Sequence, residues 1–300
     1  MARSFLQLEE LKIEECFMLE EIVAKEEEVD EAVPRFPQLF ELHASDRGKT
    51  QAITATPLRK LVLNDLPKLK HIWDVDSQGL LTLQNLLSVQ VLRCDSLKSI
   101  FPASIARSLL QLEKLKIEEC CMLKEIVAKE EEVDEAVPRF VFPQLTWLEL
   151  FRLSSLKSFY SGLHISEWPV LKYLQVWQCD KVETFSLESS SFQVTNGESQ
   201  HEMPMRQHLF LFDKVPFTNL ESLLLEWNLA YKEVLLEKLP EYSCKLKVLG
   251  LRGFHKETDI CVSCFLHKLP NLEELIVHRG FFKEIFLYEG LGYKFETPGR

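Results

Sequence analysis

The chain has 300 residues, of which 46% are hydrophobic, and it carries a net charge of −11. This composition is ordinary for a soluble protein, and no stretch approaches the 18 or more consecutive apolar residues of a membrane span. The acidic balance argues against a basic nucleic-acid-binding surface. Because no apolar run of signal-peptide type opens the sequence, we expect the chain to reside in the cytoplasm or nucleus.

One apolar pattern returns along the whole chain. Over residues 112–126 it reads L-x-x-L-x-L-x-x-C-x-x-L-x-x-I, and from Leu58 onward successive copies start 28, 26, 33, 26, 49, 26 and 26 residues apart. A unit of about 26 residues lies within the range of leucine-rich repeats. The predicted units start at Leu8, near Leu39, and at Leu58, Leu86, Leu112, Leu145, Leu171, Leu220, Leu246 and Leu272.

Each unit supplies one short strand and a return segment, and it buries its leucines against its neighbours because a single unit cannot close a core. The sequence therefore predicts an α/β solenoid, a leucine-rich-repeat horseshoe. We expect a parallel β-sheet on its concave face and mostly loops and short helical turns on its convex face. A single domain of about 10 repeats should span residues 1–300, with a regular block at 1–185, a loop insertion at 186–208 and degenerate repeats at 209–300.

Two segments of the chain are nearly identical. Residues 6–36 and 110–140 align without a gap and differ at three positions, and both end in the acidic run KEEEVDEAVPRF. Two interpretations of this run stay open, a hydrated outer loop or a docking surface for a basic partner. The segment that leads into the second copy, residues 104–115, is the best candidate for a helical start, with Ser104 as its N-cap.

The cysteines follow the repeat rather than a chemical motif. Cys16, Cys94, Cys120 and Cys179 share the position after the strand, which predicts buried, free thiols. Cys261 and Cys264 form a C-x-x-C pair, but no second pair lies at zinc spacing, and we expect no metal.

The sequence contains no complete catalytic or nucleotide-binding motif. Gly48-Lys49-Thr50 lacks the earlier glycine of a phosphate-binding loop, because His43 occupies that place. We therefore expect neither enzymatic activity nor a cofactor.

Aromatic residues gather at one part of the predicted concave face. Side chains alternate across a strand, so the residues flanking the second and third leucines of each unit point away from the core. In the units at Leu8 and Leu112 these residues are charged, whereas in the next two units aromatic residues dominate. Large aromatic patches usually mark interfaces, which favours a binding surface; the alternative is that the loop at residues 186–208 or a neighbouring domain covers the rings. The predicted partner-binding residues are Trp147, Glu149, Phe151, Tyr173, Gln175 and Trp177, with Trp227 one position further along its unit.

Several phrases resemble one family. PLRKLVLNDLPKLKHIW, LLSVQVLRCDSLKSIFPASIARSLLQLEKLKIEECCMLKEIV and QHLFLFDKVPFTNLESLLL are similar to the C-terminal leucine-rich repeats of plant coiled-coil nucleotide-binding disease-resistance proteins. The resemblance implies a module that senses pathogen effectors or modified host proteins and holds a nucleotide-binding switch inactive. The nucleotide-binding module and the coiled coil are absent from this sequence, so nucleotide binding is not implied for it.

Two classes of function remain open. The first is a protein-recognition module of plant immunity, whose partner is a pathogen effector, a host protein or the nucleotide-binding domain of a receptor. The second is a leucine-rich-repeat substrate adaptor of a ubiquitin ligase, whose repeats are similar in length. An F-box before the repeats would favour the adaptor, and this N-terminus has no room for one.

Overall fold

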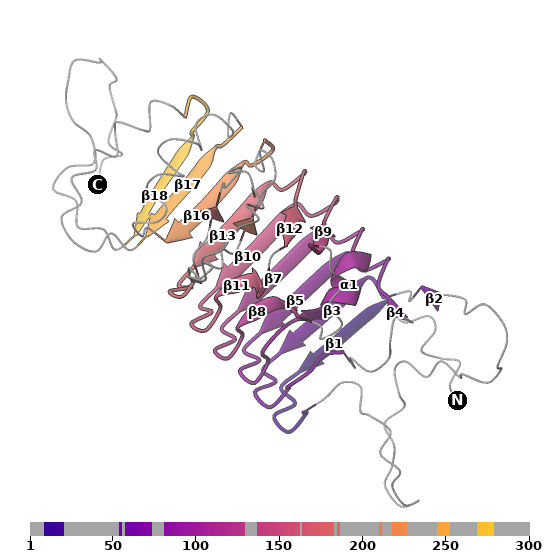
Figure 1. Cartoon of the computed structure of the whole chain (residues 1–300). Coiled ribbons are helices and arrows are strands. Elements are labelled where there is room, and N and C mark those ends of the chain that lie inside the picture. The colour runs from indigo at the N-terminus through magenta and orange to yellow at the C-terminus, as the bar shows by residue number, and fades with distance from the viewer. Residues whose placement is uncertain are drawn as a thin grey trace, which may run out of the picture.

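The computed structural model describes residues 9–20, 54–55, 58–73, 81–129, 137–162, 164–182, 185–186, 210–211, 218–226, 245–252 and 269–278. Within these residues, nine parallel strands lie side by side in one continuous sheet (Figure 1), which confirms the leucine-rich-repeat solenoid. In sheet order they are β1 (Glu10–Glu14), β3 (Lys60–Asn64), β5 (Ser88–Leu92), β7 (Lys114–Glu118), β10 (Trp147–Phe151), β13 (Tyr173–Trp177), β16 (Ser222–Glu226), β17 (Val248–Arg252) and β18 (Glu274–His278).

The repeat pattern produces this sheet directly. The second and third apolar positions of each unit are alternate residues of a strand and therefore point to one face, where they join the core. Leu115 and Ile117 of β7 are 2% and 0% exposed, and their partners on the neighbouring strands are buried as deeply. One ladder of aliphatic side chains thus runs through the successive coils.

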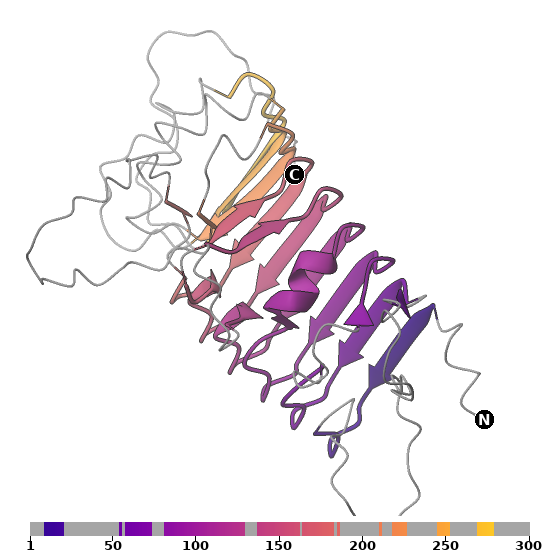
Figure 2. The same ribbon diagram turned by 45° about the vertical axis from the view of Figure 1, so that its right-hand side comes forward.

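Where the structure describes them, the return segments contain one helix and several short strands. Helix α1 (Ala103–Ser108) lies on the same side of the sheet as these strands (Figure 2). The predicted cap at Ser104 was wrong, since the N-cap is Pro102 and makes no side-chain hydrogen bond. The short strands pair between coils as β2 (Thr54–Ala55) with β4 (Leu81–Thr82), β8 (Glu125–Ala128) with both β6 (Phe101–Pro102) and β11 (Ser158–Tyr160), β9 (Arg139–Val141) with β12 (Ile165–Glu167), and β14 (Phe185–Ser186) with β15 (Phe210–Leu211).

Aromatic side chains fill the convex half of the core at the units that follow β7. Phe159 lies at the centre and contacts Phe140, Phe142, His164 and Trp168. Phe140 also contacts His164 and Phe142 also contacts Trp168, and all these ring centroids are 5.6 to 6.1 Å apart. Nδ1 of His164 lies 3.0 Å from the carbonyl oxygen of Gly162. Burial lowers the pKa of His164, so the ring is neutral inside this cluster.

Two long stretches of chain lie between strands that are direct neighbours. β1 pairs with β3 over five residues, so the predicted unit near Leu39 adds no strand between them. Leu39 itself lies outside the described residues. β13 likewise pairs directly with β16, although 49 residues separate the starts of the two strands.

Among the described residues, six non-glycine residues have a positive φ, and each directly follows one of the first six strands of the sheet. Their φ values lie between 50° and 56°, a left-handed conformation that turns the chain sharply toward the convex side. The residue that follows each of them points its side chain toward the end of the strand. This is the repeat position that the cysteines occupy. The six residues are Glu15, Asp65, Arg93, Glu119, Arg152 and Gln178.

The predicted burial of the repeat cysteines holds for three of four. Cys94, Cys120 and Cys179 are buried free thiols, whereas Cys16 is exposed because β1 is the first strand of the described sheet. Sγ of Cys120 lies 3.3 Å from the carbonyl oxygen of Glu118, and Sγ of Cys94 makes the same contact at 3.4 Å with Leu92. The thiols therefore satisfy strand-end carbonyl groups.

Candidate functional site

The predicted aromatic residues come together on the concave face of β10 and β13. The strand register pairs Trp147 with Tyr173 and Phe151 with Trp177. Neighbouring parallel strands are about 4.8 Å apart, so paired side chains on one face touch. We call these four residues the aromatic cluster. All four are half-buried.

Trp147 and Tyr173 form the tightest contact of the cluster. Their ring centroids are 3.6 Å apart and their planes differ by 8°. On the other face of the indole ring, Nζ of Lys114 lies 4.8 Å from the ring centroid. Trp147 is thus held between a cation and a second ring, an arrangement that combines cation–π attraction with stacking.

Two polar side chains fix the orientation of this pair from below. Nε1 of Trp147 donates to Glu149 at 3.0 Å, and the hydroxyl of Tyr173 donates to Oε1 of Gln175 at 2.6 Å. Glu149 and Gln175 are each 8% exposed. Their position indicates that they orient the rings, which remain the accessible part of the cluster.

A charged triad continues this hydrogen-bond network toward β7. Nζ of Lys116 lies 2.9 Å from Glu118 and 3.3 Å from Glu149. Burial raises the pKa of Glu118. Burial acts in the same direction on Glu149, but hydrogen bonds from Glu118, Trp147 and Lys116 outweigh it and lower the pKa of Glu149. Burial and the negative charges of Glu149 and Glu118 raise the pKa of Tyr173 to about 12, so its hydroxyl remains a donor at neutral pH.

The other two aromatic residues contact cationic or imidazole groups. The guanidinium of Arg152 lies 4.9 Å from the ring centroid of Phe151. Trp177 meets Arg252 at 5.7 Å and the ring of His278 at 6.1 Å, both from C-terminal repeats. Its buried Nε1 has no acceptor within the part of the chain that the structure describes.

Some predicted features fall outside the described residues. Trp227, the pair Cys261 and Cys264, residues 25–36 and most of residues 129–140 are among them. The aromatic cluster therefore contains the predicted residues of two units only. The role of the acidic runs stays a prediction.

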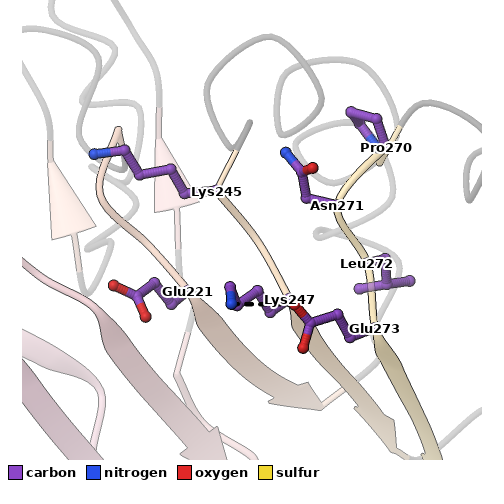
Figure 3. Close-up of a pocket in the computed structure, with 7 residues that line it drawn as sticks. All are labelled: Glu221, Lys245, Lys247, Pro270, Asn271, Leu272 and Glu273. Atoms are coloured by element: carbon purple, nitrogen blue, oxygen red, sulfur yellow. Dashed lines mark ion pairs between the residues drawn. The ribbon is translucent and has the colours of Figure 1, made fainter.

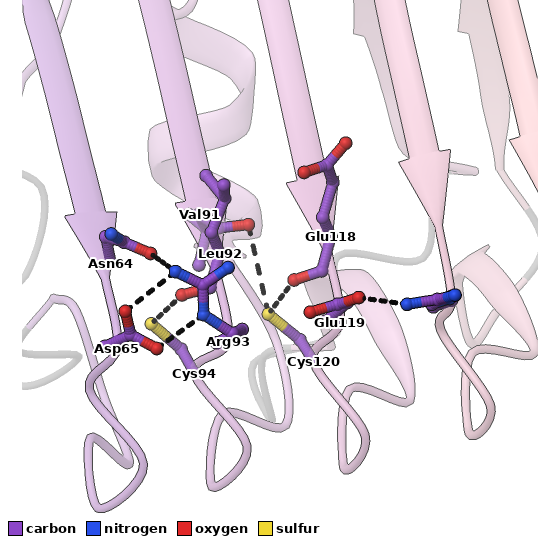
Figure 4. A network of polar contacts seen from close by, with 10 residues as sticks. Asn64, Asp65, Val91, Leu92, Arg93, Cys94, Glu118, Glu119 and Cys120 are labelled. Carbon is purple, nitrogen blue, oxygen red and sulfur yellow. Dashed lines mark hydrogen bonds and ion pairs between the residues drawn. The ribbon is translucent and has the colours of Figure 1, made fainter.

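A polar network at the strand ends was not predicted from the sequence. Arg93 donates to both carboxylate oxygens of Asp65 at 2.5 and 2.7 Å and to Asn64 at 2.8 Å (Figure 4). Arg152 makes the equivalent contacts with Glu119 at 2.5 Å and Gln178 at 2.8 Å. The signal in the sequence is a polar residue directly after each of the strands β1, β3, β5, β7, β10 and β13. These residues can be matched to one another only once the register of the strands is known.

A shallow depression lies at the start of β16, β17 and β18 (Figure 3). Its volume is about 720 Å³, and its lysines and glutamates alternate along the strand starts. Lys247 pairs with Glu273 at 3.1 Å, and Nζ of Lys245 donates to Asn219 at 2.7 Å. Glu221 pairs with Lys172 at 3.3 Å. Because the lining contains two lysines and two glutamates, the depression has no excess charge to attract an ion.

Two further properties hold for the described residues alone. No three His, Cys, Asp or Glu side chains there are placed to hold a metal ion. No helix there combines the length and the apolar character needed to cross a membrane.

The fold and the concave surface define the class of the protein as a leucine-rich-repeat protein-interaction module, a class that is generally non-enzymatic. Residues 1–121 match the family of leucine-rich repeats described as plant disease resistance protein RPS2-like. This match confirms the resemblance to plant disease-resistance repeats over β1 to β7. Neither the curated proteins nor the solved structures gave a match.

Proposed function

We propose that this chain is a recognition module of plant innate immunity that binds a protein through the aromatic cluster on its concave face. The partner is a pathogen effector, a host protein that an effector modifies, or the nucleotide-binding switch domain of a receptor, and binding takes place in the cytoplasm. The family match over residues 1–121 supports the biological setting. The stacked pair Trp147 and Tyr173 supports the binding surface.

The cluster has the properties of a binding hot spot. Tryptophan and tyrosine bury a large area while few side-chain rotations are frozen on binding. In Trp147 and Tyr173 those rotations are already restricted by the stack and by hydrogen bonds to Glu149 and Gln175. A partner would therefore meet preorganised rings, which lowers the entropic cost of association.

A library of random 12-residue peptides displayed on phage tests the surface even though the natural partner is unidentified. Peptides selected on the wild-type chain should bind the double variant Trp147→Ala/Trp177→Ala at least about 10-fold more weakly, since hot-spot truncations cost about 2 kcal/mol or more. Phe17→Ala is the matched control, because Phe17 is 59% exposed and lies in the turn after β1. Equal binding to wild type and double variant would show that the aromatic cluster is not the recognition surface.

A second experiment tests whether the chain acts in plant immunity or as a ubiquitin-ligase adaptor. The purified chain is mixed with the isolated nucleotide-binding domain of a plant coiled-coil disease-resistance receptor and, separately, with the scaffold proteins of a ubiquitin ligase. Binding to the first that is lost in the double variant supports the immune function. Binding to the scaffold proteins alone would contradict the immune function and favour a substrate adaptor of a ubiquitin ligase.

A further inference from the structure

We propose that the aromatic cluster recognises an arginine side chain of its protein partner, which stacks on the outer face of Tyr173 above Ser222. This inference rests on the proposed function and specifies the chemistry that the concave face selects. It begins from the row of first concave positions, which contains Lys114, Trp147, Tyr173, Ser222, Val248 and Glu274 in sheet order.

Three residues of this row are stacked, in the order Lys114, Trp147 and Tyr173. The cation of Lys114 lies at one end of the stack, and no described side chain continues the stack beyond Tyr173. Lys114 lies over the free face of Trp147, and Tyr173 covers the opposite face. The outer face of Tyr173 is turned to β16, where the register partner is Ser222. A serine side chain is too short to cover a ring, and no described residue makes a ring contact with this face.

The neighbours of Ser222 suit a planar group with an aliphatic stem. Strands β13, β16 and β17 are adjacent (Figure 1), so Tyr173 and Val248 stand two strand spacings, about 9.6 Å, apart on either side of Ser222. Leu224, the next residue of β16 on the same face, is apolar and 7% exposed. A partner's side chain above Ser222 would therefore meet a ring on one side, a valine on the other and a leucine below, with the serine hydroxyl as a hydrogen-bond acceptor.

Charge favours arginine among planar side chains. The whole chain has a net charge of −11, and Glu149, whose pKa is lowered, supplies a negative charge beneath the rings. The nearby cations Lys114 and Arg252 already lie over the rings of Trp147 and Trp177. Glu274, at the end of the same row, makes no ion pair with a described residue. The guanidinium group is planar, always charged and weakly hydrated, so it stacks on tyrosine at a spacing similar to the 3.6 Å between Trp147 and Tyr173. A lysine ammonium lacks the plane, and a neutral aromatic ring lacks the charge.

Short peptides test the side-chain preference directly. The probes are acetyl-Gly-Gly-X-Gly-Gly-amide peptides in which X is arginine, lysine or citrulline, the last having the shape of arginine without its charge. The readout is the NMR signal of Tyr173 in protein with ¹³C-labelled tyrosine rings, identified among the six tyrosines by Tyr173→Phe. We expect saturable shifts with the arginine peptide, at least about 3-fold weaker binding of lysine and about 10-fold weaker binding of citrulline.

Substitutions at Ser222 locate the site. Ser222→Arg supplies the guanidinium from the chain itself, so it should move the Tyr173 signal in the free protein and abolish the response to the arginine peptide. Ser222→Ala should retain the response, since the ring is unchanged. Tyr173→Leu keeps an apolar side chain but removes the ring, and it should lose the arginine preference when binding is followed through the arginine peptide's own signals. If arginine and citrulline peptides bind alike, or if the response survives Ser222→Arg, the arginine site is disproved.

The two proposals fail in different ways. Phage-selected peptides that need Trp147 and Trp177 but contain no required arginine would leave the proposed function intact and disprove the arginine site. Selected peptides that ignore the aromatic cluster would contradict the proposed function, whatever the short peptides do.

Discussion

Trp147 and Tyr173, which are 26 residues apart in sequence, lie face to face at 3.6 Å because the register of β10 and β13 places them opposite each other. The contact joins two repeats on the concave face, independently of the leucine ladder beneath. It therefore couples adjacent coils and forms part of the proposed recognition surface.

The strength of this contact is measurable. In a double-mutant cycle with Trp147→Ala and Tyr173→Ala, we expect a coupling free energy of about 0.5 to 1.5 kcal/mol, the range of stacked aromatic pairs. Urea unfolding followed by circular dichroism provides the measurement. The control cycle combines Phe151→Ala with Tyr173→Ala, which are not register partners, and its coupling should be near zero. Similar couplings in both cycles would contradict the stack.

Gly250 should resist substitution although it lies inside a strand. Alanine usually stabilises such a position by about 0.5 to 1 kcal/mol relative to glycine. A Cβ at Gly250, however, would lie 2.9 Å from Cγ of Leu224, the branch point of a buried side chain on the neighbouring strand. We therefore expect Gly250→Ala to lower the free energy of unfolding by about 1 to 3 kcal/mol.

A second substitution at Leu224 tests whether crowding against this side chain is what destabilises Gly250→Ala. A Leu224→Ala background removes Cγ and Cδ2, which would lie 2.9 and 3.3 Å from the new Cβ, and keeps only Cβ at 3.3 Å. Most of the cost of Gly250→Ala should therefore disappear in that background. Thermal unfolding of the four proteins measures the effect. A loss of the same size in both backgrounds would show that Leu224 is not responsible.

His164 should make stability depend on pH on the acid side. Its pKa is lowered by burial, so as pH falls the unfolded chain takes up the proton first. Stability is complete above the unfolded pKa of about 6.5 and decreases as pH falls below it. His164→Phe should flatten this dependence, and urea unfolding of both proteins between pH 5 and 8 tests the difference. An unchanged slope in the variant would mean that other groups govern it.

Cysteine reactivity should follow exposure. Cys16 and Cys121 are exposed, whereas Cys120 and Cys179 are buried. The hydrogen bond with Cys94 and burial raise the pKa of Cys120, and burial raises that of Cys179 to about 12. We expect N-ethylmaleimide to modify the exposed pair in the folded protein and the buried pair only after unfolding, as read by mass spectrometry of the peptides.

Asp95 offers an internal check on this result. Its hydrogen bond and negative charge raise the pKa of Cys121. Asp95→Asn should therefore increase the rate of Cys121 modification at pH 7 while the rate at Cys16 stays the same. Equal changes at both cysteines would point to a global loosening of the fold.

The repeat period was sufficient to predict the sheet and the face on which each concave side chain lies. It placed Trp147 beside Tyr173 correctly, because a parallel register follows from equal unit lengths. It did not predict the short convex strands, which are two to four residues long and pair only with the same segment of the next coil. The burial of Glu149 also escaped prediction, since alternation assigns a side chain to a face but not the rings that cover it.

β1 pairs directly with β3, and β13 pairs directly with β16, although a long connection joins the strands of each pair. The arrangement of the strands in the sheet therefore does not depend on the length of the connection between them. A connection can gain or lose residues at these two junctions while the strands on either side keep their partners. The junction between β13 and β16 adjoins the proposed recognition surface, so new sequence accepted there would change the surroundings of the aromatic cluster without redesign of the scaffold.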